Sequence, residues 1–141
     1  MLVNCVSPEL CNVNTLALLA MSNYTFYQTG SRYFGTETAE SDWDFFTAQY
    51  DEGGFSTHVE EFLQKHGFKR CGKEQAEKYN DNITCGVYEK DNVHVQLVMN
   101  INRKIAMQKI LKDTGVLNTR VDKAVAKQLW KVAYHATSGV I

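Results

Sequence analysis

The chain has 141 residues, of which 44% are hydrophobic and 22% are charged, and its formal net charge is −1. This length predicts a single domain with a substantial core, and this composition is that of an ordered, globular chain. A net charge near zero excludes the global basic field that non-specific nucleic-acid binders use, although local basic patches remain compatible with it.

The cysteines and the N-terminus favour a cytoplasmic protein without a membrane segment. No two cysteines have C-x-x-C spacing, and the four histidines lie far from any cysteine pair, so neither a disulfide framework nor a zinc site is expected. We expect reduced, mostly structural thiols. The chain does not open with a basic stretch followed by a long apolar run, so we expect neither a signal peptide nor a membrane span. The cysteines are Cys5, Cys11, Cys71 and Cys85.

The first third of the chain predicts a helix followed by two strands. Ser7 supplies a capping hydroxyl, proline follows at the first helical position, and apolar residues then recur with helical spacing over 8–21. The segments 24–30 and 42–49 are rich in aromatic residues and predict strands, the first of which ends at Gly30.

The middle of the chain predicts a second helix. Thr57 and Glu60 have the spacing of a capping box at the start of a helix over 58–66. Gly67 stands where a helix C-cap is expected. This helix separates the first two strands from a later pair.

The last 60 or so residues predict a hairpin and two helices. The β-rich segments 83–90 and 93–100 flank Asp91-Asn92, which is a strong signal for a two-residue hairpin turn. Apolar periodicity then predicts helices over 103–115 and 119–136.

These elements predict an α+β fold with the order α-β-β-α-β-β-α-α. We expect a small mixed or antiparallel sheet of about four strands flanked by helices. No internal repeat or linker interrupts the chain, so residues 1–141 are expected to form one domain, with 102–141 as a C-terminal helical pair packed on it.

Two aspartates inside the second strand require an explanation. Asp42 and Asp44 are two residues apart, so on a strand they share one face, while Trp43 and Phe45 point the other way into the core. Two carboxylates about 6 Å apart repel by about 3 kcal/mol at an effective dielectric near 20. A divalent cation relieves this repulsion, and hard oxygen ligands of this kind suit Mg²⁺. The alternative is an exposed strand with a solvated acidic face.

The turn before this strand has the composition of a phosphate site. Gly30 permits backbone amides to approach an anion closely, Ser31 can donate its hydroxyl to a phosphate oxygen, and Arg32 can add charge. The alternatives are an ordinary turn at Gly30-Ser31 and a half-solvated Arg32.

The stretch TGSRYFGTETAESDWDFF resembles the h-G-[GS] … [DE]-h-[DE] signature of the nucleotidyltransferase fold superfamily (polymerase β-like). The short chain is similar to the compact, stand-alone members of that superfamily from microbes and bacteriophages. The resemblance implies that Gly30 and Ser31 bind the phosphates of an NTP. It also implies that Asp42 and Asp44 bind Mg²⁺ or Mn²⁺. The implied reaction transfers a nucleoside monophosphate from the NTP to a hydroxyl group of RNA, a protein or a small molecule.

The resemblance also implies a third acid on a later strand, and His94 stands where we expect it. The segment 93–98 presents either His94 and Gln96 or Val93 and Val95 inward. An imidazole can act as a general base or as a softer metal ligand, and Glu89 across the hairpin is a weaker replacement. His94 can equally be a hydrogen-bonded structural residue.

The missing acid leaves a second function open: a catalytically degenerate member that binds a nucleotide or a partner protein. An RNA-binding module is a third, but it needs a basic face. Lysines on the two C-terminal helices form either solvated faces or, if the last helix borders the cleft, a surface that attracts a triphosphate or nucleic acid. They are Lys104, Lys109, Lys112, Lys123, Lys127 and Lys131.

Overall fold

The computed structural model describes residues 8–51, 54–55, 57–72 and 82–141. The elements run in chain order as α1 (Pro8–Met21), β1 (Tyr27–Thr29), α2 (Ser31–Phe34), β2 (Trp43–Ala48), β3 (Tyr50–Asp51), β4 (Gly54–Phe55), α3 (His58–Lys65), β5 (Lys69–Arg70), β6 (Thr84–Lys90), β7 (Val93–Val98), α5 (Ile101–Thr114) and α6 (Lys123–Ala136). In this part of the chain five strands form one sheet in the order β1-β2-β7-β6-β5, and β3 and β4 form a separate ribbon.

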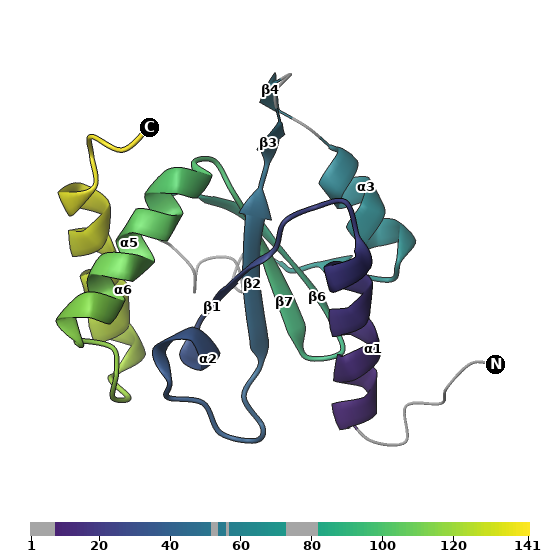
Figure 1. The fold of residues 1–141 in the computed structure, drawn as a ribbon, viewed down its shortest axis with the longest axis horizontal. Helices are drawn as coiled ribbons and strands as arrows, with labels where there is room; N and C mark the ends of the chain where they lie inside the picture. The colour runs from purple at the N-terminus through teal and green to yellow at the C-terminus, as the bar shows by residue number, and fades with distance from the viewer. Residues whose placement is uncertain (1–7, 52–53, 56, 73–81) are drawn as a thin grey trace.

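The sheet is mixed, as expected for an α+β fold. Strands β2 and β7 are parallel, and the other neighbouring pairs are antiparallel. A parallel pair needs a long crossover, and here the chain between β2 and β7 passes through helix α3 and strands β5 and β6. Helices cover the two faces of the sheet (Figure 1).

The expected order α-β-β-α-β-β-α-α is wrong in three places. It lacks helix α2 directly after Gly30, the edge strand β5, and the β3-β4 ribbon. Helix α2 has four residues, and strands β3, β4 and β5 have two residues each. Elements this short do not complete a hydrophobic period, so the sequence pattern cannot reveal them.

Helices α1 and α3 pack against one face of the sheet. Leu19 from α1 and Leu63 from α3 form a buried cluster with Val93, Val95 and Leu97 from β7. The alternation along β7 therefore directs its odd-numbered residues to this face, which leaves His94 and Gln96 on the other.

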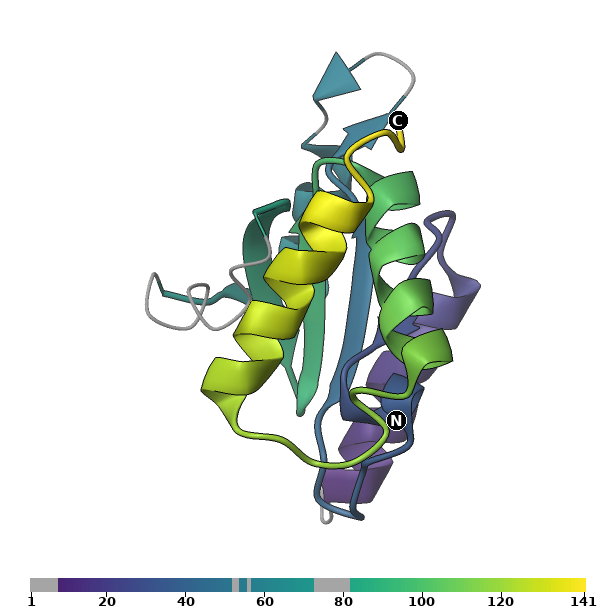
Figure 2. The same cartoon turned by 90° about the vertical axis from the view of Figure 1, so that its left-hand side faces the viewer.

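Helices α5 and α6 lie side by side over the opposite face (Figure 2). They share a second apolar cluster with helix α2, in which Met107 and Leu111 from α5 pack with Ala133 from α6 and Phe34 from α2. Helix α6 begins at Lys123, four residues later than the segment 119–136 predicts, and Asp122 is its N-cap residue. None of the helices in the described ranges is long and apolar enough to cross a membrane.

The predicted hairpin turn and the two predicted glycine helix ends are confirmed by their backbone angles. Asp91 and Asn92 have φ values of 50° and 66°, as a type I′ hairpin turn requires. Gly67 and Gly115 have φ values of 89° and 74° at the ends of helices α3 and α5.

The predicted capping box at the start of helix α3 is wrong. Thr57 has φ −97° and ψ 0°, not the extended backbone that a capping side chain needs, and its hydroxyl lies 3.3 Å from Glu61 Oε1 instead. Glu60 pairs with Arg70 at 3.1 Å and accepts a hydrogen bond from the Tyr88 hydroxyl at 3.2 Å. The guanidinium charge outcompetes a backbone N–H for this carboxylate.

Cys71 and Cys85 are free thiols, and the side chains of Cys5 and Cys11 lie outside the described part of the chain. Burial raises the pKa of the Cys71 thiol, and the Glu89 carboxylate raises it further.

Cys71 is expected to react with iodoacetamide more slowly in the folded protein than in urea. The thiolate is the reactive species. At any pH in the usual range of thiol titration, a raised pKa lowers the fraction of Cys71 that is thiolate. Peptide mapping by mass spectrometry measures this rate residue by residue, and Glu89→Gln should speed the reaction of the folded chain. Equal folded and unfolded rates across the pH range would contradict the expectation.

Candidate functional site

One row of side chains crosses the whole sheet and is polar in every strand. The strand register pairs Thr29 with Asp44, Asp44 with His94, His94 with Glu89, and Glu89 with Lys69. Directly paired residues point to the same face of a sheet, so all five side chains share one face. It is the face of helices α5 and α6.

The two aspartates and His94 form the centre of this row. His94 Nδ1 lies 3.5 Å from Asp42 Oδ2 and 3.5 Å from Asp44 Oδ1, and its Nε2 lies 3.1 Å from Glu89 Oε2. The His94 side chain is only 7% exposed, whereas that of Asp42 is 44% exposed. The imidazole is thus held between the aspartate pair and a third carboxylate, one strand further along the sheet.

Asp42 and Asp44 point to the opposite face of the sheet from Trp43 and Phe45, as the two-residue period of a strand predicts. Trp43 and Phe45 pack against the cluster under helices α1 and α3, while Asp42 and Asp44 line a pocket on the other face.

Gly30 lies against the Asp44 carboxylate. A Cβ atom at position 30 would overlap Asp44 Oδ2 and would lie 3.0 Å from the Cβ and Cγ atoms of Asp44. The φ value of Gly30 is 73°, a conformation that L-residues with a side chain rarely adopt. Both the backbone and the space beside Asp44 therefore require glycine, and Ser31 follows as the first residue of helix α2.

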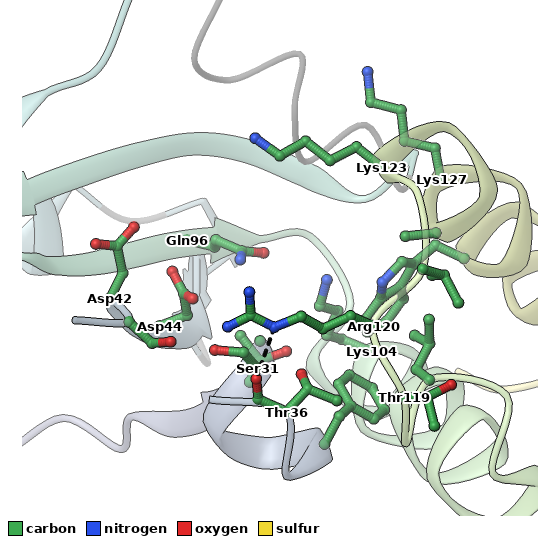
Figure 3. Close-up of a pocket in the computed structure, with 18 of the residues that line it drawn as sticks. Ser31, Thr36, Asp42, Asp44, Gln96, Lys104, Thr119, Arg120, Lys123 and Lys127 are labelled. Carbon is green, nitrogen blue, oxygen red and sulfur yellow. Dashed lines mark hydrogen bonds between the residues drawn. The ribbon is translucent and has the colours of Figure 1, made fainter. Parts of the chain in front are cut away.

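A pocket of about 650 Å³ opens over this site and has two walls of opposite charge. Figure 3 shows the aspartates on one side of it, with Ser31 and Thr36 below and the basic side chains opposite. Arg120 extends across the pocket, and its Nε donates a hydrogen bond to the Thr36 carbonyl at 3.3 Å. The acidic wall consists of Glu40, Asp42 and Asp44, and the basic wall of Lys104, Arg120, Lys123 and Lys127.

Lys104 is the buried member of the basic wall. Its residue exposure is 3%, and its Nζ lies 4.2 Å from the centroid of the Trp130 ring and 5.8 Å from that of Phe46. Aromatic faces of this kind stabilise a cation that has left water. Lys104 thus lies between two aromatic rings in a pocket whose opposite wall is acidic.

Arg32 does not line the pocket, so the structure does not bring it to the predicted phosphate site. Its guanidinium lies 3.9 Å from the Trp43 ring centroid, and its Nη2 donates to the Ser41 carbonyl at 2.9 Å. These contacts fix the loop that precedes strand β2. Arg32 therefore helps to position the aspartates through Trp43 and Ser41, and not from within the pocket.

The sequence positions of the lysines on the two C-terminal helices do not indicate which of them share a site. Lys104, Lys123 and Lys127 line the pocket, whereas Lys109 pairs with Asp113 at 2.7 Å and Lys112 donates to the Tyr33 carbonyl at 2.6 Å. Arg120, Trp130 and Thr36 also line the pocket and were missed. The i, i+4 spacing of Lys123 and Lys127 is the one signal that could have indicated a basic face.

Within the described ranges, no three or more His, Cys, Asp or Glu side chains form a ready-made metal-binding cluster. The chemistry of the site is therefore that of an aspartate pair with a buried histidine and a facing basic wall. Comparisons with protein-family models, with curated proteins and with solved structures found no match to this chain.

Proposed function

We propose that this protein is a metal-dependent nucleotidyltransferase that moves a nucleoside monophosphate from an NTP to a hydroxyl group. The observation that carries the proposal is the pocket over Gly30-Ser31, in which two aspartates face four basic side chains. A triphosphate with its cation has this charge pattern, since the phosphates need positive partners and the cation needs carboxylates.

The aspartate pair fits a divalent cation of the Mg²⁺ or Mn²⁺ type. Such cations take one or two protein carboxylates and complete their shell with phosphate oxygens and water, so a cluster of three protein ligands is not required. Gly30 allows the Asp44 carboxylate to lie against the phosphate turn, because a Cβ at position 30 would overlap its Oδ2 atom. When bound, the cation neutralises phosphate charge and polarises the reacting oxygens.

The protein's own groups supply binding and proton transfer. Lys104, Arg120 and the α6 lysines bind the triphosphate, and the Ser31 hydroxyl donates to a phosphate oxygen. The acceptor oxygen forms a bond to the α-phosphorus, the bond from that phosphorus to the bridging oxygen breaks, and pyrophosphate leaves. His94 accepts the hydroxyl proton at Nδ1, because Glu89 holds its Nε2–H at 3.1 Å.

The topology supports the resemblance seen in the sequence. Gly30-Ser31 follows strand β1. Asp42 directly precedes strand β2, and Asp44 is the second residue of that strand. His94 is the register partner of Asp44 on the adjacent strand β7. This is the position at which the resemblance implies a third acid. The proposal includes a cytoplasmic location, where NTPs and Mg²⁺ are abundant, and an acceptor that is RNA, a protein or a small molecule.

The second candidate is a degenerate nucleotidyltransferase that binds a nucleotide or a partner protein without chemistry. It is favoured by one observation: a histidine, not a carboxylate, lies beside the aspartate pair. A histidine is a weaker ligand for Mg²⁺ than a carboxylate.

Label transfer from NTPs distinguishes the two candidates. The protein is incubated with Mg²⁺ or Mn²⁺ and each α-labelled NTP, together with RNA, protein and hydroxylated small molecules, and pyrophosphate release is followed. Metal-dependent labelling of an acceptor supports the enzyme, whereas metal-dependent nucleotide binding without turnover supports the degenerate binder. If no NTP binds, the enzyme and the nucleotide-binding form of the second candidate are both wrong.

Lys104→Met is expected to weaken NTP binding by about 10- to 100-fold, which is the contribution of a hydrogen bond to a charged group. Methionine is similar in volume and makes favourable contacts with an aromatic ring such as Trp130, so stability should change by less than about 1.5 kcal/mol. Isothermal titration with a non-hydrolysable ATP analogue measures the affinity. The matched control is Lys109→Met, because Lys109 lies on the same helix but is exposed and paired with Asp113.

A further inference from the structure

A second pocket adjoins the aspartate pair from the other side of His94. It has a volume of about 400 Å³, and its walls include Lys69, Glu89, Asn92 and His94. His94 lines this pocket, while its Nδ1 lies 3.5 Å from both Asp42 Oδ2 and Asp44 Oδ1, which line the first. The imidazole therefore lies between the lining of the second pocket and the aspartates of the first, where a group that serves both the acceptor and the donor of a transfer reaction is needed.

The charges of the second pocket are balanced, unlike those of the first. Lys69 and Lys90 face Glu89 and Asp91. Three of these four already contact other residues: Lys90 Nζ donates to the His66 carbonyl at 2.8 Å, Asp91 accepts from Thr15 at 2.9 Å, and Glu89 Oε2 lies 3.1 Å from His94 Nε2. Lys69 and Glu89 are both exposed, so a ligand can still reach them. A polyanion would gain little here, because the neighbouring carboxylates repel it.

In the described part of the chain, the second pocket also has no aromatic surface on which a base could stack. No Phe, Tyr or Trp is among the described residues that line it, and the His94 side chain is only 7% exposed. Recognition of single-stranded RNA depends on such stacking and on cationic contacts to phosphate. The lining of the second pocket consists of amide, ammonium, carboxylate and imidazole groups, which are hydrogen-bonding partners for hydroxyl groups.

We propose that the second pocket binds the acceptor and that the acceptor is an uncharged, hydroxyl-rich small molecule of the sugar or polyol class. This inference rests on the proposed function and specifies its acceptor. The acceptor's hydroxyls donate to Glu89 and accept from Lys69, and one of them is directed past His94 toward the α-phosphorus. The new phosphorus–oxygen bond forms there as the bond to pyrophosphate breaks, and His94 receives the proton.

The test is a pair of titrations followed by amide NMR on the full chain labelled with ¹⁵N. The first adds Mg²⁺ with a non-hydrolysable ATP analogue, which should shift the amides of Ser31 and Thr36. The second adds myo-inositol or glucose, which should shift the amides of Gly67, Lys69 and Asn92. A parallel titration with a short ribo-oligonucleotide that ends in a free hydroxyl should leave these three amides unchanged.

Charge-reversal variants identify the second pocket as the site. Lys69→Glu should weaken polyol binding about five- to tenfold, because the hydrogen bonds donated by the ammonium group are lost, and should leave binding of the ATP analogue unchanged. Lys65→Glu is the matched control, because Lys65 is also exposed but lies at the end of helix α3 and does not line the pocket. It should change neither titration.

The outcomes separate this inference from the proposed function. Shifts at the second pocket caused by the oligonucleotide, or no shifts there at millimolar polyol, overturn the inference even if the ATP analogue binds at the first pocket. Failure of the ATP analogue to bind overturns the proposed function instead.

Discussion

An Asp44→Asn variant is expected to lose about a thousandfold in the rate of NTP-dependent pyrophosphate release while it stays folded. The loss of one preorganised charged group at a reacting phosphate typically costs two to three orders of magnitude. Asp44 is the register partner of His94 and lies against Gly30, so its carboxylate adjoins both the predicted base and the predicted phosphate turn. Asparagine keeps the shape of the side chain and removes only its charge.

The control for this prediction comes from the same wall of the pocket. Glu40 lines the pocket but is exposed and lies outside the polar row of the sheet, so Glu40→Gln should retain most of the activity. Circular dichroism melting of both variants checks that each is folded. Equal rates for the wild type and a folded Asp44→Asn variant would contradict the role of Asp44 and would leave the aspartates as an acidic face.

Much of the fold follows from local patterns in the sequence. The alternation of β7 directs Val93, Val95 and Leu97 to the face under helices α1 and α3, and Asp91-Asn92 adopts the left-handed backbone that its residue types favour. Gly115 likewise ends helix α5 where the sequence predicts. These signals suffice because each depends on residues that are close in the chain.

The elements that sequence reasoning missed depend on tertiary contacts. Strand β5 consists of Lys69 and Arg70, both exposed, and it exists because they pair with Glu89 and Tyr88 at the sheet edge. The capping box failed for the same reason, since Glu60 contacts a guanidinium ten residues away instead of its own helix terminus.

Part of the candidate site also follows from local patterns, and part depends on tertiary contacts. That Asp42 and Asp44 share a face follows from the two-residue period of a strand, and that His94 is the residue beside them follows from the alternation of polar residues on its own strand. The lysine positions are compatible with solvated faces as well as with a basic wall, and Arg120 was not predicted, because these residues line one pocket with Ser31 only through the packing of helix α6 beside helix α5. A sequence separation of about 90 residues carries no signal of that arrangement in a single chain.

Gly30→Ala is expected to destabilise the protein by about 2 to 4 kcal/mol and to slow nucleotide transfer by about a hundredfold. Part of the cost is the backbone, because φ 73° and ψ −160° lie in a region that essentially only glycine adopts, at a cost of about 1 to 3 kcal/mol for other residues. The rest is steric, since the new methyl group would overlap the Asp44 carboxylate. That carboxylate must rotate away, and a displacement of about 1 Å at a reacting centre can cost about a hundredfold in rate.

Gly35→Ala is the control for a positive φ value without a steric clash. Gly35 has φ 81° and ψ 20°, in the milder left-handed helical region, and a Cβ there would meet nothing within 4 Å. It should lose about 1 kcal/mol of unfolding free energy in urea and keep its activity. Gly30→Ala, measured in the same way, should lose more stability, and its activity should stay low under conditions where it is fully folded. If both variants lose the same free energy and keep activity, the contact between Gly30 and Asp44 does not control the geometry of the site.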